Sequence, residues 1–284
     1  TVVNLSVNSG NVVSGCVMDI FIVAGQSNAN GQGEVSTLSP AQAAAHDVKF
    51  FCSWHSEGYN AETQQYFSDW ADQTEAGYTR AYTFNNNFGN GGALGGDTDA
   101  GAFGPSSWFG PEVGFAARAL ELNLTGGNQL GIIKYGVDGS GLSTATEIVA
   151  ASDWDVSAAG YRQGDAWRGF QAAIADAVAK LEADGISPNF KGMIWWQGEG
   201  GTSTPALNNF ITAVRAHLAN NYGLENPLDF PVVITTGGKM IGGSTLESGV
   251  AGIDDDVTFV NADHYGQLYQ THVGRGSEGS SDHT

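Results

Sequence analysis

The residues best suited to chemistry follow the first apolar run of the chain. Residues 18–24 are mostly apolar and lead directly into Gly25-Gln26-Ser27-Asn28. A strand of this kind places the Ser27 hydroxyl at the carboxyl end of a parallel sheet, where open α/β sheets bind their ligands. Backbone N–H groups at the start of a following helix would be available there for an anion. Ser27 is therefore a candidate nucleophile, although serine is also a common helix N-cap.

The elements that would position Ser27 can be inferred from the alternation of short apolar runs with longer amphipathic stretches. The apolar runs predict strands over residues 18–24, 48–53, 130–137, 192–196 and 232–235, and they leave open a sixth over residues 257–260. The amphipathic stretches predict helices over residues 112–122, 167–183 and 205–220. Glu112 follows Gly110-Pro111, which is typical of a helix start. We therefore predict a three-layer α/β/α sandwich with a mostly parallel sheet of about five strands.

The composition limits the partners of this chain. Its 284 residues, 41% of them hydrophobic, are enough for one large domain over residues 1–284. A formal net charge of -19 argues against nucleic acid or an anionic membrane surface and favours a neutral substrate. No apolar run is long enough to span a bilayer, and no signal peptide is visible in the given chain. Scarce lysine and few cysteines lead us to expect a secreted or extracellular protein.

Two segments leave alternatives open. Residues 56–107 read as a long loop insertion that contains several aromatic side chains, including Tyr59, Tyr66, Phe67, Trp70 and Phe88. Such rings stack on sugars, but they can equally pack on the body of the domain. Cys16 precedes one predicted strand and Cys52 lies within the next. The sequence leaves open whether these two cysteines form a disulfide.

Four blocks of sequence, in this order, resemble those of the acetylesterases related to sialate O-acetylesterase and carbohydrate esterase family six. They are Gly25-Gln26-Ser27-Asn28, the Gly-Pro-Glu start at residues 110–116, the glycine block at residues 136–140 and Trp-Trp-Gln-Gly-Glu at residues 195–199. The resemblance covers most of the chain from Asp19 onward. It implies the SGNH-hydrolase fold, which is flavodoxin-like, and removal of acetyl groups from a carbohydrate by a serine nucleophile.

The blocks suggest a role for each residue around Ser27. A tetrahedral intermediate needs several donors directed at one oxygen. The backbone N–H groups of Ser27 and Gly139 and the side-chain amide of Gln197 would supply them. Gly139 suits this role because a residue without Cβ lets the backbone approach a ligand, although it is also an ordinary glycine between strand and loop. Gln26, Asn28 and Glu199 are predicted to support the site, and Glu199 to brace the backbone.

The base is the weakest part of the resemblance. A serine nucleophile needs a histidine oriented by an acid, and the family carries both near the C-terminus as Asp-x-x-His. No histidine here has an aspartate three residues before it. We favour Asp282 and His283, because they follow the last predicted strand by a loop. His264 and His272 remain alternatives, and a histidine beyond residue 284 would complete the family motif. His217 is expected to be an ordinary helix residue.

The predicted reaction needs no cofactor and no metal, and the cysteine and histidine spacings show no zinc pattern. We expect the substrate to be an acetylated polysaccharide of plant or algal type. A sialic acid would favour an arginine at the site, and Arg80, Arg162 and Arg168 are the candidates for one. The alternatives are a sialate O-acetylesterase and a carbohydrate-binding domain that has lost catalysis. The oligomeric state is left open.

Overall fold

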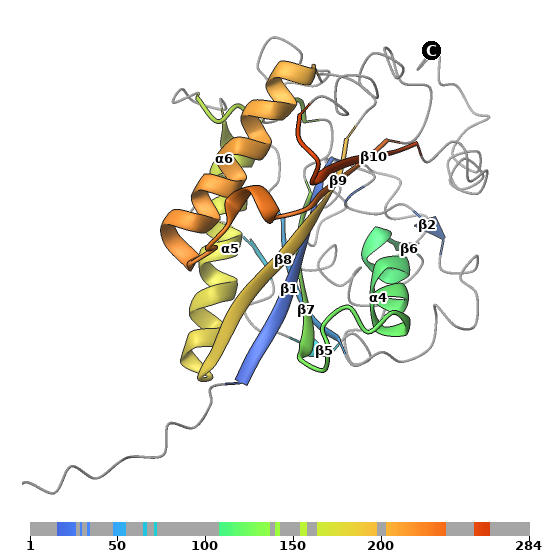
Figure 1. The fold of residues 1–284 in the computed structure, drawn as a ribbon, viewed down its shortest axis with the longest axis vertical. Coiled ribbons are helices and arrows are strands. Elements are labelled where there is room, and N and C mark those ends of the chain that lie inside the picture. Colours follow the sequence, from blue (N-terminus) through green and yellow to red (C-terminus); the bar gives the residue numbers. More distant parts are fainter. Residues whose placement is uncertain are drawn as a thin grey trace, which may run out of the picture.

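The computed structural model describes residues 16–26, 29, 33–34, 48–54, 65–66, 71–72, 108–136, 140–142, 154–157, 164–197, 203–236 and 253–261. Within these residues a sheet of parallel strands runs through the centre of the molecule (Figure 1). Its strands are β1 (Cys16–Gly25), β3 (Val48–Trp54), β7 (Gln129–Gly136), β8 (Ile186–Trp196), β9 (Val232–Thr236) and β10 (Val257–Asn261). Two short strands, β4 (Gln65–Tyr66) and β5 (Ala71–Asp72), pair antiparallel with β3. A separate antiparallel pair joins β2 (Gly33–Glu34) and β6 (Trp108–Phe109).

The order in which the strands are added to the sheet reverses at β1. Across the sheet the order is β10-β9-β8-β1-β7-β3. The chain moves from β1 outward to β3, returns to β7 beside β1, and then crosses to β8 on the other side of β1. Ligands of open α/β sheets bind outside the carboxyl ends of the strands at such a reversal. The end of β1, which leads into Ser27, is therefore where a site is expected.

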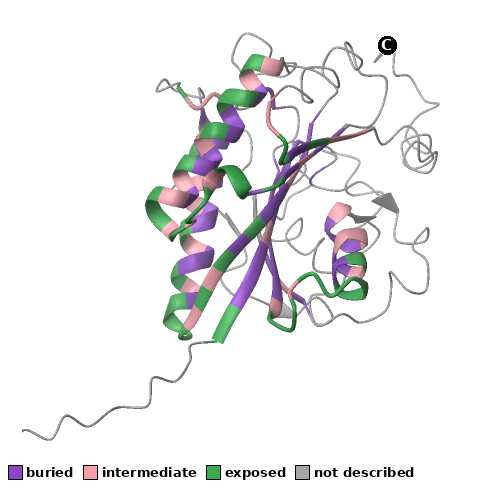
Figure 2. Ribbon diagram, in the orientation of Figure 1, coloured by how far each residue is buried: buried purple, intermediate pink, exposed green. Residues whose placement is uncertain are grey.

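Helices cover both faces of the sheet, which confirms the predicted three-layer α/β/α sandwich (Figure 1). On one face lie α5 (Asp165–Ala183) and α6 (Thr204–Tyr222). On the other lies α4 (Pro111–Glu121), whose Phe115 ring packs 4.9 Å from that of Phe21. The short helix η5 (Pro227–Asp229) connects α6 to β9. Figure 2 shows that α5 and α6 bury the sides that face the sheet and expose the others.

The core follows from the alternation of side chains along each strand. Ile20 and Ile22 of β1 join the cluster under α5 and α6, whereas Phe21 between them faces α4. In α5 four apolar residues at helical spacing are buried in this cluster: Phe170, Ile174, Val178 and Leu181. Burial of this face contributes most of the stability of such a helix.

The predicted elements are all present, with changes at their ends. Six parallel strands are found where about five were expected, because the run at residues 257–260 does form the edge strand β10. Strand β8 begins at Ile186, well before the predicted start at Gly192. Its first half alternates between exposed and partly buried residues and contains Pro188, so it lacks the continuous apolar run of the other strands. The predicted loop insertion contains the short strands β4 and β5, and its other residues lie outside the described ones.

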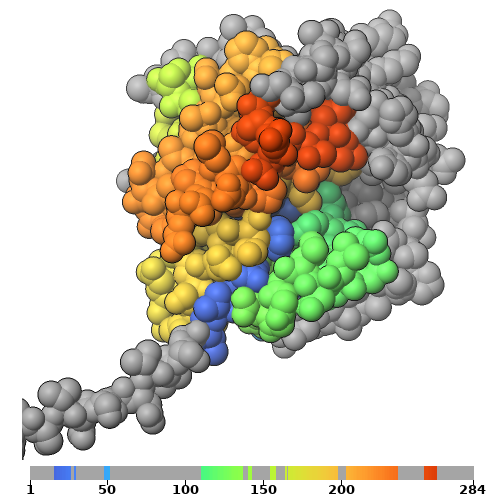
Figure 3. Space-filling view, in the orientation of Figure 1, coloured from blue at the N-terminus to red at the C-terminus, as the bar shows by residue number. Residues whose placement is uncertain are grey.

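The structure decides against a disulfide between the two cysteines. Cys16 is a free thiol at the start of β1, and β1 reaches the surface beside α4 in the space-filling view (Figure 3). Cys52 in β3 is level with Lys134, which is itself level with Val23 of β1. About seven residues of extended strand, or roughly 23 Å, thus separate the two positions along the sheet. A disulfide needs Cα atoms within about 7 Å.

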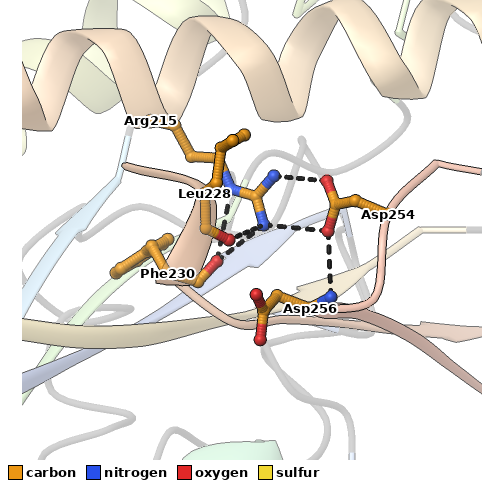
Figure 4. A network of polar contacts seen from close by, with 5 residues as sticks. All are labelled: Arg215, Leu228, Phe230, Asp254 and Asp256. Carbon is orange, nitrogen blue, oxygen red and sulfur yellow. Dashed lines mark hydrogen bonds and ion pairs between the residues drawn. The ribbon is translucent and has the colours of Figure 1, made fainter. Parts of the chain in front are cut away.

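A buried arginine ties α6 to the loops that precede β9 and β10 (Figure 4). The Arg215 guanidinium donates to the Phe230 and Leu228 carbonyls and to both carboxylate oxygens of Asp254, with a shortest distance of 2.6 Å. The Asp254 carboxylate also accepts from the Asp256 N–H at 3.0 Å. The hydrogen bonds from Arg215 hold the pKa of Asp254 below its usual range. This network therefore holds α6 to the segments that lead into β9 and β10.

Candidate functional site

The end of β1 is held against the end of β8 by a close backbone contact. Gly25 has a φ of +145°, and a Cβ at this position would overlap the Trp196 carbonyl. The Gln26 N–H donates to that carbonyl at 3.0 Å. Only glycine allows such an approach, which explains the first residue of the Gly-Gln-Ser-Asn block. The residue before Ser27 is therefore fixed to β8 next to Gln197.

The side chain of Gln197 links the end of β8 to the segment that follows β7. Its Nε2 donates to the Ser140 carbonyl at 3.2 Å, and the side chain is 1% exposed. Ser140 follows Gly139 directly in the chain. The structure thus brings members of three predicted blocks together at the carboxyl end of the sheet: Gln26 after β1, Ser140 after β7 and Gln197 after β8.

The segment at residues 140–142 is anchored by Trp154, a residue that the sequence interpretation did not include. The Trp154 indole Nε1–H donates to the Ser140 Oγ at 2.8 Å, and the Trp154 backbone N–H donates to the Gly141 carbonyl at 2.8 Å. The indole is fully buried. Its ring packs edge-on against four aromatic rings at centroid distances of 4.8 to 5.8 Å: Tyr135, Phe170, Trp195 and Phe210.

A buried ion pair lies on the face of β7 that is covered by α4, opposite the face on which Trp154 packs. Lys134 Nζ is 2.8 Å from Glu112 Oε2, and both side chains are 1% exposed. The other oxygen, Glu112 Oε1, accepts from the Gly110 N–H at 3.2 Å. A Cβ at Gly110 would overlap both Glu112 Oε2 and Lys134 Nζ. The sequence indicated Glu112 only as part of a helix start and of the Gly-Pro-Glu block. The lysine within the apolar run of residues 130–137 was the available signal for its partner.

The side-chain nitrogen of Gln26 is buried and has no partner among the described residues. The residue is 2% exposed, and its Nε2 has no hydrogen-bond partner in the described part of the chain. A buried unpaired donor costs about 1–3 kcal/mol. Gln26 immediately precedes Ser27, so this amide is a candidate for contact with a bound ligand.

Most of the predicted catalytic residues lie outside the described residues: Ser27, Asn28, Gly139, Glu199, His264, His272, Asp282 and His283. Their roles stay predictions. His217 is a helix residue of α6, as expected, and its Nδ1 lies 3.2 Å from Gln171 Nε2 and 3.1 Å from Asn221 Nδ2. Burial lowers the pKa of His217.

The described residues provide neither a cluster of metal ligands nor a helix that could span a membrane. No group of three or more histidine, cysteine, aspartate or glutamate side chains in the described ranges is arranged to hold a metal ion. Among the helices in the same ranges, none is both long enough and apolar enough to cross a bilayer.

Comparison with known proteins gives one family. Residues 17–234 match the family described as carbohydrate esterase, sialic acid-specific acetylesterase. No curated protein matches the chain in sequence. Among solved structures, the crystal structure of NanS aligns over 88% of this chain and 79% of its own, with 16% sequence identity and a TM-score of 0.49. At that identity and TM-score, the alignment carries no argument about function. The family match includes the ends of β1, β7 and β8.

Proposed function

The chain belongs to this family of carbohydrate esterases, and on that premise we propose that Ser27 removes O-acetyl groups from a carbohydrate through an acetyl-serine intermediate. Family membership makes the chain a carboxylic ester hydrolase. The observation that carries the assignment of the site is the meeting of three strand ends. Gln26 is bonded to Trp196, and Gln197 is bonded to Ser140. Gln26, which precedes Ser27, and Ser140, which follows Gly139, are thereby held where the strand order reverses.

In the proposed reaction, a histidine takes the Ser27 proton while the hydroxyl oxygen attacks the acetyl carbonyl. The tetrahedral intermediate expels the sugar oxygen, which regains a proton from the histidine. Water then attacks the acetyl-serine by the same route and releases acetate. Asp282 and His283 are our proposed acid and base, with His264 and His272 as alternatives.

The oxyanion would be stabilised by the N–H groups of Ser27 and Gly139 and by the Gln197 amide. The amide nitrogen of Gln197 is a hydrogen-bond donor, and it lies 3.2 Å from the Ser140 carbonyl oxygen. That bond also fixes the orientation of the amide, because Gln197 is buried. A donor oriented before the reaction needs no reorganisation as charge develops, which is how oxyanion holes accelerate acyl transfer.

For the substrate we propose a neutral acetylated polysaccharide, deacetylated outside the cell. The net charge of -19 disfavours an anionic sugar. Of the arginines named as candidates for such a sugar, Arg168 is an exposed residue of α5, and Arg80 and Arg162 lie outside the described residues. Two other arginines of the described residues are engaged elsewhere. Arg215 is bonded to Asp254 and two carbonyls, and Arg118 pairs with Glu121 on the surface of α4. A sialate O-acetylesterase is also consistent with the family match.

The decisive experiment replaces Ser27 with alanine. Wild-type protein should hydrolyse a small acetyl ester and release acetate from acetylated xylan, whereas Ser27→Ala should lose both activities with an unchanged circular dichroism spectrum. Activity above about a tenth of wild type in this variant would remove Ser27 as nucleophile. Wild-type binding of xylan without any acetate release would favour a carbohydrate-binding domain. Faster release from an O-acetylated sialic acid than from xylan would overturn the substrate proposal.

Further substitutions test the other proposed roles. Gln197→Ala should lower kcat about a hundredfold or more with little change in KM, because an oxyanion donor acts in the transition state. An unchanged kcat would make Gln197 a structural amide.

The acid and base are tested as a pair. Asp282→Asn should lose most activity, by up to about ten-thousandfold, because an amide no longer holds the imidazole in the required tautomer. His264→Ala should retain activity. The reverse result would assign the base to His264.

A further inference from the structure

Trp154 fixes the segment next to Gly139 through two separate hydrogen bonds. Its indole Nε1–H donates to the Ser140 Oγ, and its backbone N–H donates to the Gly141 carbonyl, each at 2.8 Å. The indole N–H is the only polar group of a tryptophan side chain and can only donate. The four surrounding rings set the plane of the indole and hence the direction of that N–H. A phenylalanine would keep most ring contacts but would lose the bond to Ser140.

Ser140 in turn joins the two proposed oxyanion donors that lie outside the nucleophile block. Its carbonyl accepts from the Gln197 amide at 3.2 Å. Its backbone nitrogen is bonded to Gly139, and consecutive Cα atoms are about 3.8 Å apart. A rotation or shift of Ser140 therefore changes the position of Gly139 and the acceptor of Gln197 together.

We propose that Trp154 and Ser140 are positioning residues for the oxyanion hole: the indole-to-hydroxyl bond holds Ser140 in the one arrangement that directs both Gly139 and Gln197 at the oxyanion. This inference rests on the proposed function. Neither side chain touches the reacting atoms in this proposal. The aromatic cluster under α5 and α6 thus serves catalysis as well as stability, because it fixes the direction of the donor.

The size of the effect follows from what the bond controls. Loss of one oxyanion donor costs about 10²–10³ in kcat, and a displacement of about 1 Å can cost about a hundredfold. Removal of the indole-to-hydroxyl bond loosens two donors without deleting either. We expect kcat to fall by about 10- to 100-fold, with KM within about threefold of wild type, because the loss is confined to the transition state.

The test breaks the same bond from both ends. Trp154→Phe removes the donor, and Ser140→Ala removes the acceptor. Because each variant removes the whole bond, the double variant should be no slower than the slower single variant. The matched control is Trp167→Phe. Trp167 stacks on Phe170 in the same cluster, and in the described part of the chain its indole donates no hydrogen bond. This control should keep wild-type kcat.

Each assay measures kcat and KM on a small acetyl ester, below the thermal midpoint of every variant. If the kcat of Trp154→Phe is no lower than that of Trp167→Phe, the inference is wrong. It is also wrong if the two single losses multiply in the double variant, since separate routes would then be acting. Replacement of Trp154 by its benzothienyl isostere keeps the ring size while removing the N–H. It should reproduce the loss in kcat even if the phenylalanine variant folds poorly.

The Ser27→Ala variant separates this inference from the proposed function. If Ser27→Ala is inactive while Trp154→Phe and Ser140→Ala both match wild type, only the positioning role fails. If wild type shows no hydrolysis that depends on Ser27, the proposed function fails and the positioning role falls with it.

Discussion

Replacing Lys134 with methionine would leave the Glu112 carboxylate buried without its positive partner. Both side chains are 1% exposed and 2.8 Å apart, so solvent cannot take over the role of the lost ammonium group. Removing one member of a buried ion pair typically costs about 3–5 kcal/mol. For a chain of 284 residues, an unfolding entropy of about 2.1 cal/mol/K per residue converts this loss into a fall of about 5–8 °C in Tm.

The double variant makes this prediction specific to the ion pair. Glu112→Gln alone should also destabilise the protein, because it leaves the ammonium group buried. Lys134→Met combined with Glu112→Gln removes both charges, and the glutamine oxygen can still accept from the Gly110 N–H, as Glu112 Oε1 does now at 3.2 Å. Replacing both charges is often nearly neutral, so the double variant should recover most of the lost stability.

The assay is urea unfolding of the four proteins, with Arg118→Met as the control. Arg118 and Glu121 form an ion pair of 2.6 Å whose side chains are 59% and 66% exposed. Loss of such a surface pair should cost less than about 1 kcal/mol. The reasoning is refuted if Lys134→Met is no more destabilising than Arg118→Met, or if the double variant is as unstable as the two single losses added together.

Three further variants test other contacts. Gly25→Ala should destabilise the protein by more than about 3 kcal/mol in urea unfolding, because its Cβ overlaps the Trp196 carbonyl; wild-type stability would contradict that contact. Arg215 lowers the pKa of Asp254, so the advantage of wild type over Asp254→Asn should be present at pH 7 and lost as the pH falls below about 4; equal midpoints at pH 7 would refute this. Burial lowers the pKa of His217, so as the pH is lowered the imidazole is protonated in the unfolded chain before it is protonated in the folded protein. Wild-type stability should therefore fall as the pH drops below about 6.5. In thermal scans at several pH values, His217→Phe should flatten that dependence, and an unchanged dependence would contradict it.

The fold was predictable because local sequence patterns indicate its strands and helices. Six apolar runs became the six parallel strands, since strands buried on both faces need continuous apolar sequence. The first half of β8 was missed because it lacks a continuous apolar run. Its exposed residues alternate with partly buried ones, and Pro188 argues against a central strand. The order of the strands, with β1 between β7 and β8, depends on pairings between distant segments that no local pattern encodes.

The candidate site was predictable only where a motif carried it. Gln26 and Gln197 came from short blocks, and the structure places them at neighbouring strand ends. Trp154 lies outside every block, and its importance comes from a bond to Ser140 that spans 14 residues of sequence. A single tryptophan in a polar stretch indicates burial but not which acceptor it reaches. The absence of a disulfide between Cys16 and Cys52 likewise became clear only from the register of β1, β7 and β3, because the spacing of two cysteines in the sequence does not give their distance in a sheet.

Strand β7 shows how one element can be fixed from both faces just before the site. Lys134 and Tyr135 are consecutive, so their side chains point to opposite faces of the sheet. Lys134 is held by Glu112 of α4, and Tyr135 packs 5.5 Å from the Trp154 ring in the cluster under α5 and α6. The chain is fixed again at Ser140. Because oxyanion stabilisation depends on donors that do not reorganise during the reaction, such fixation on both sides of residues 137–139 is what a backbone donor at Gly139 requires.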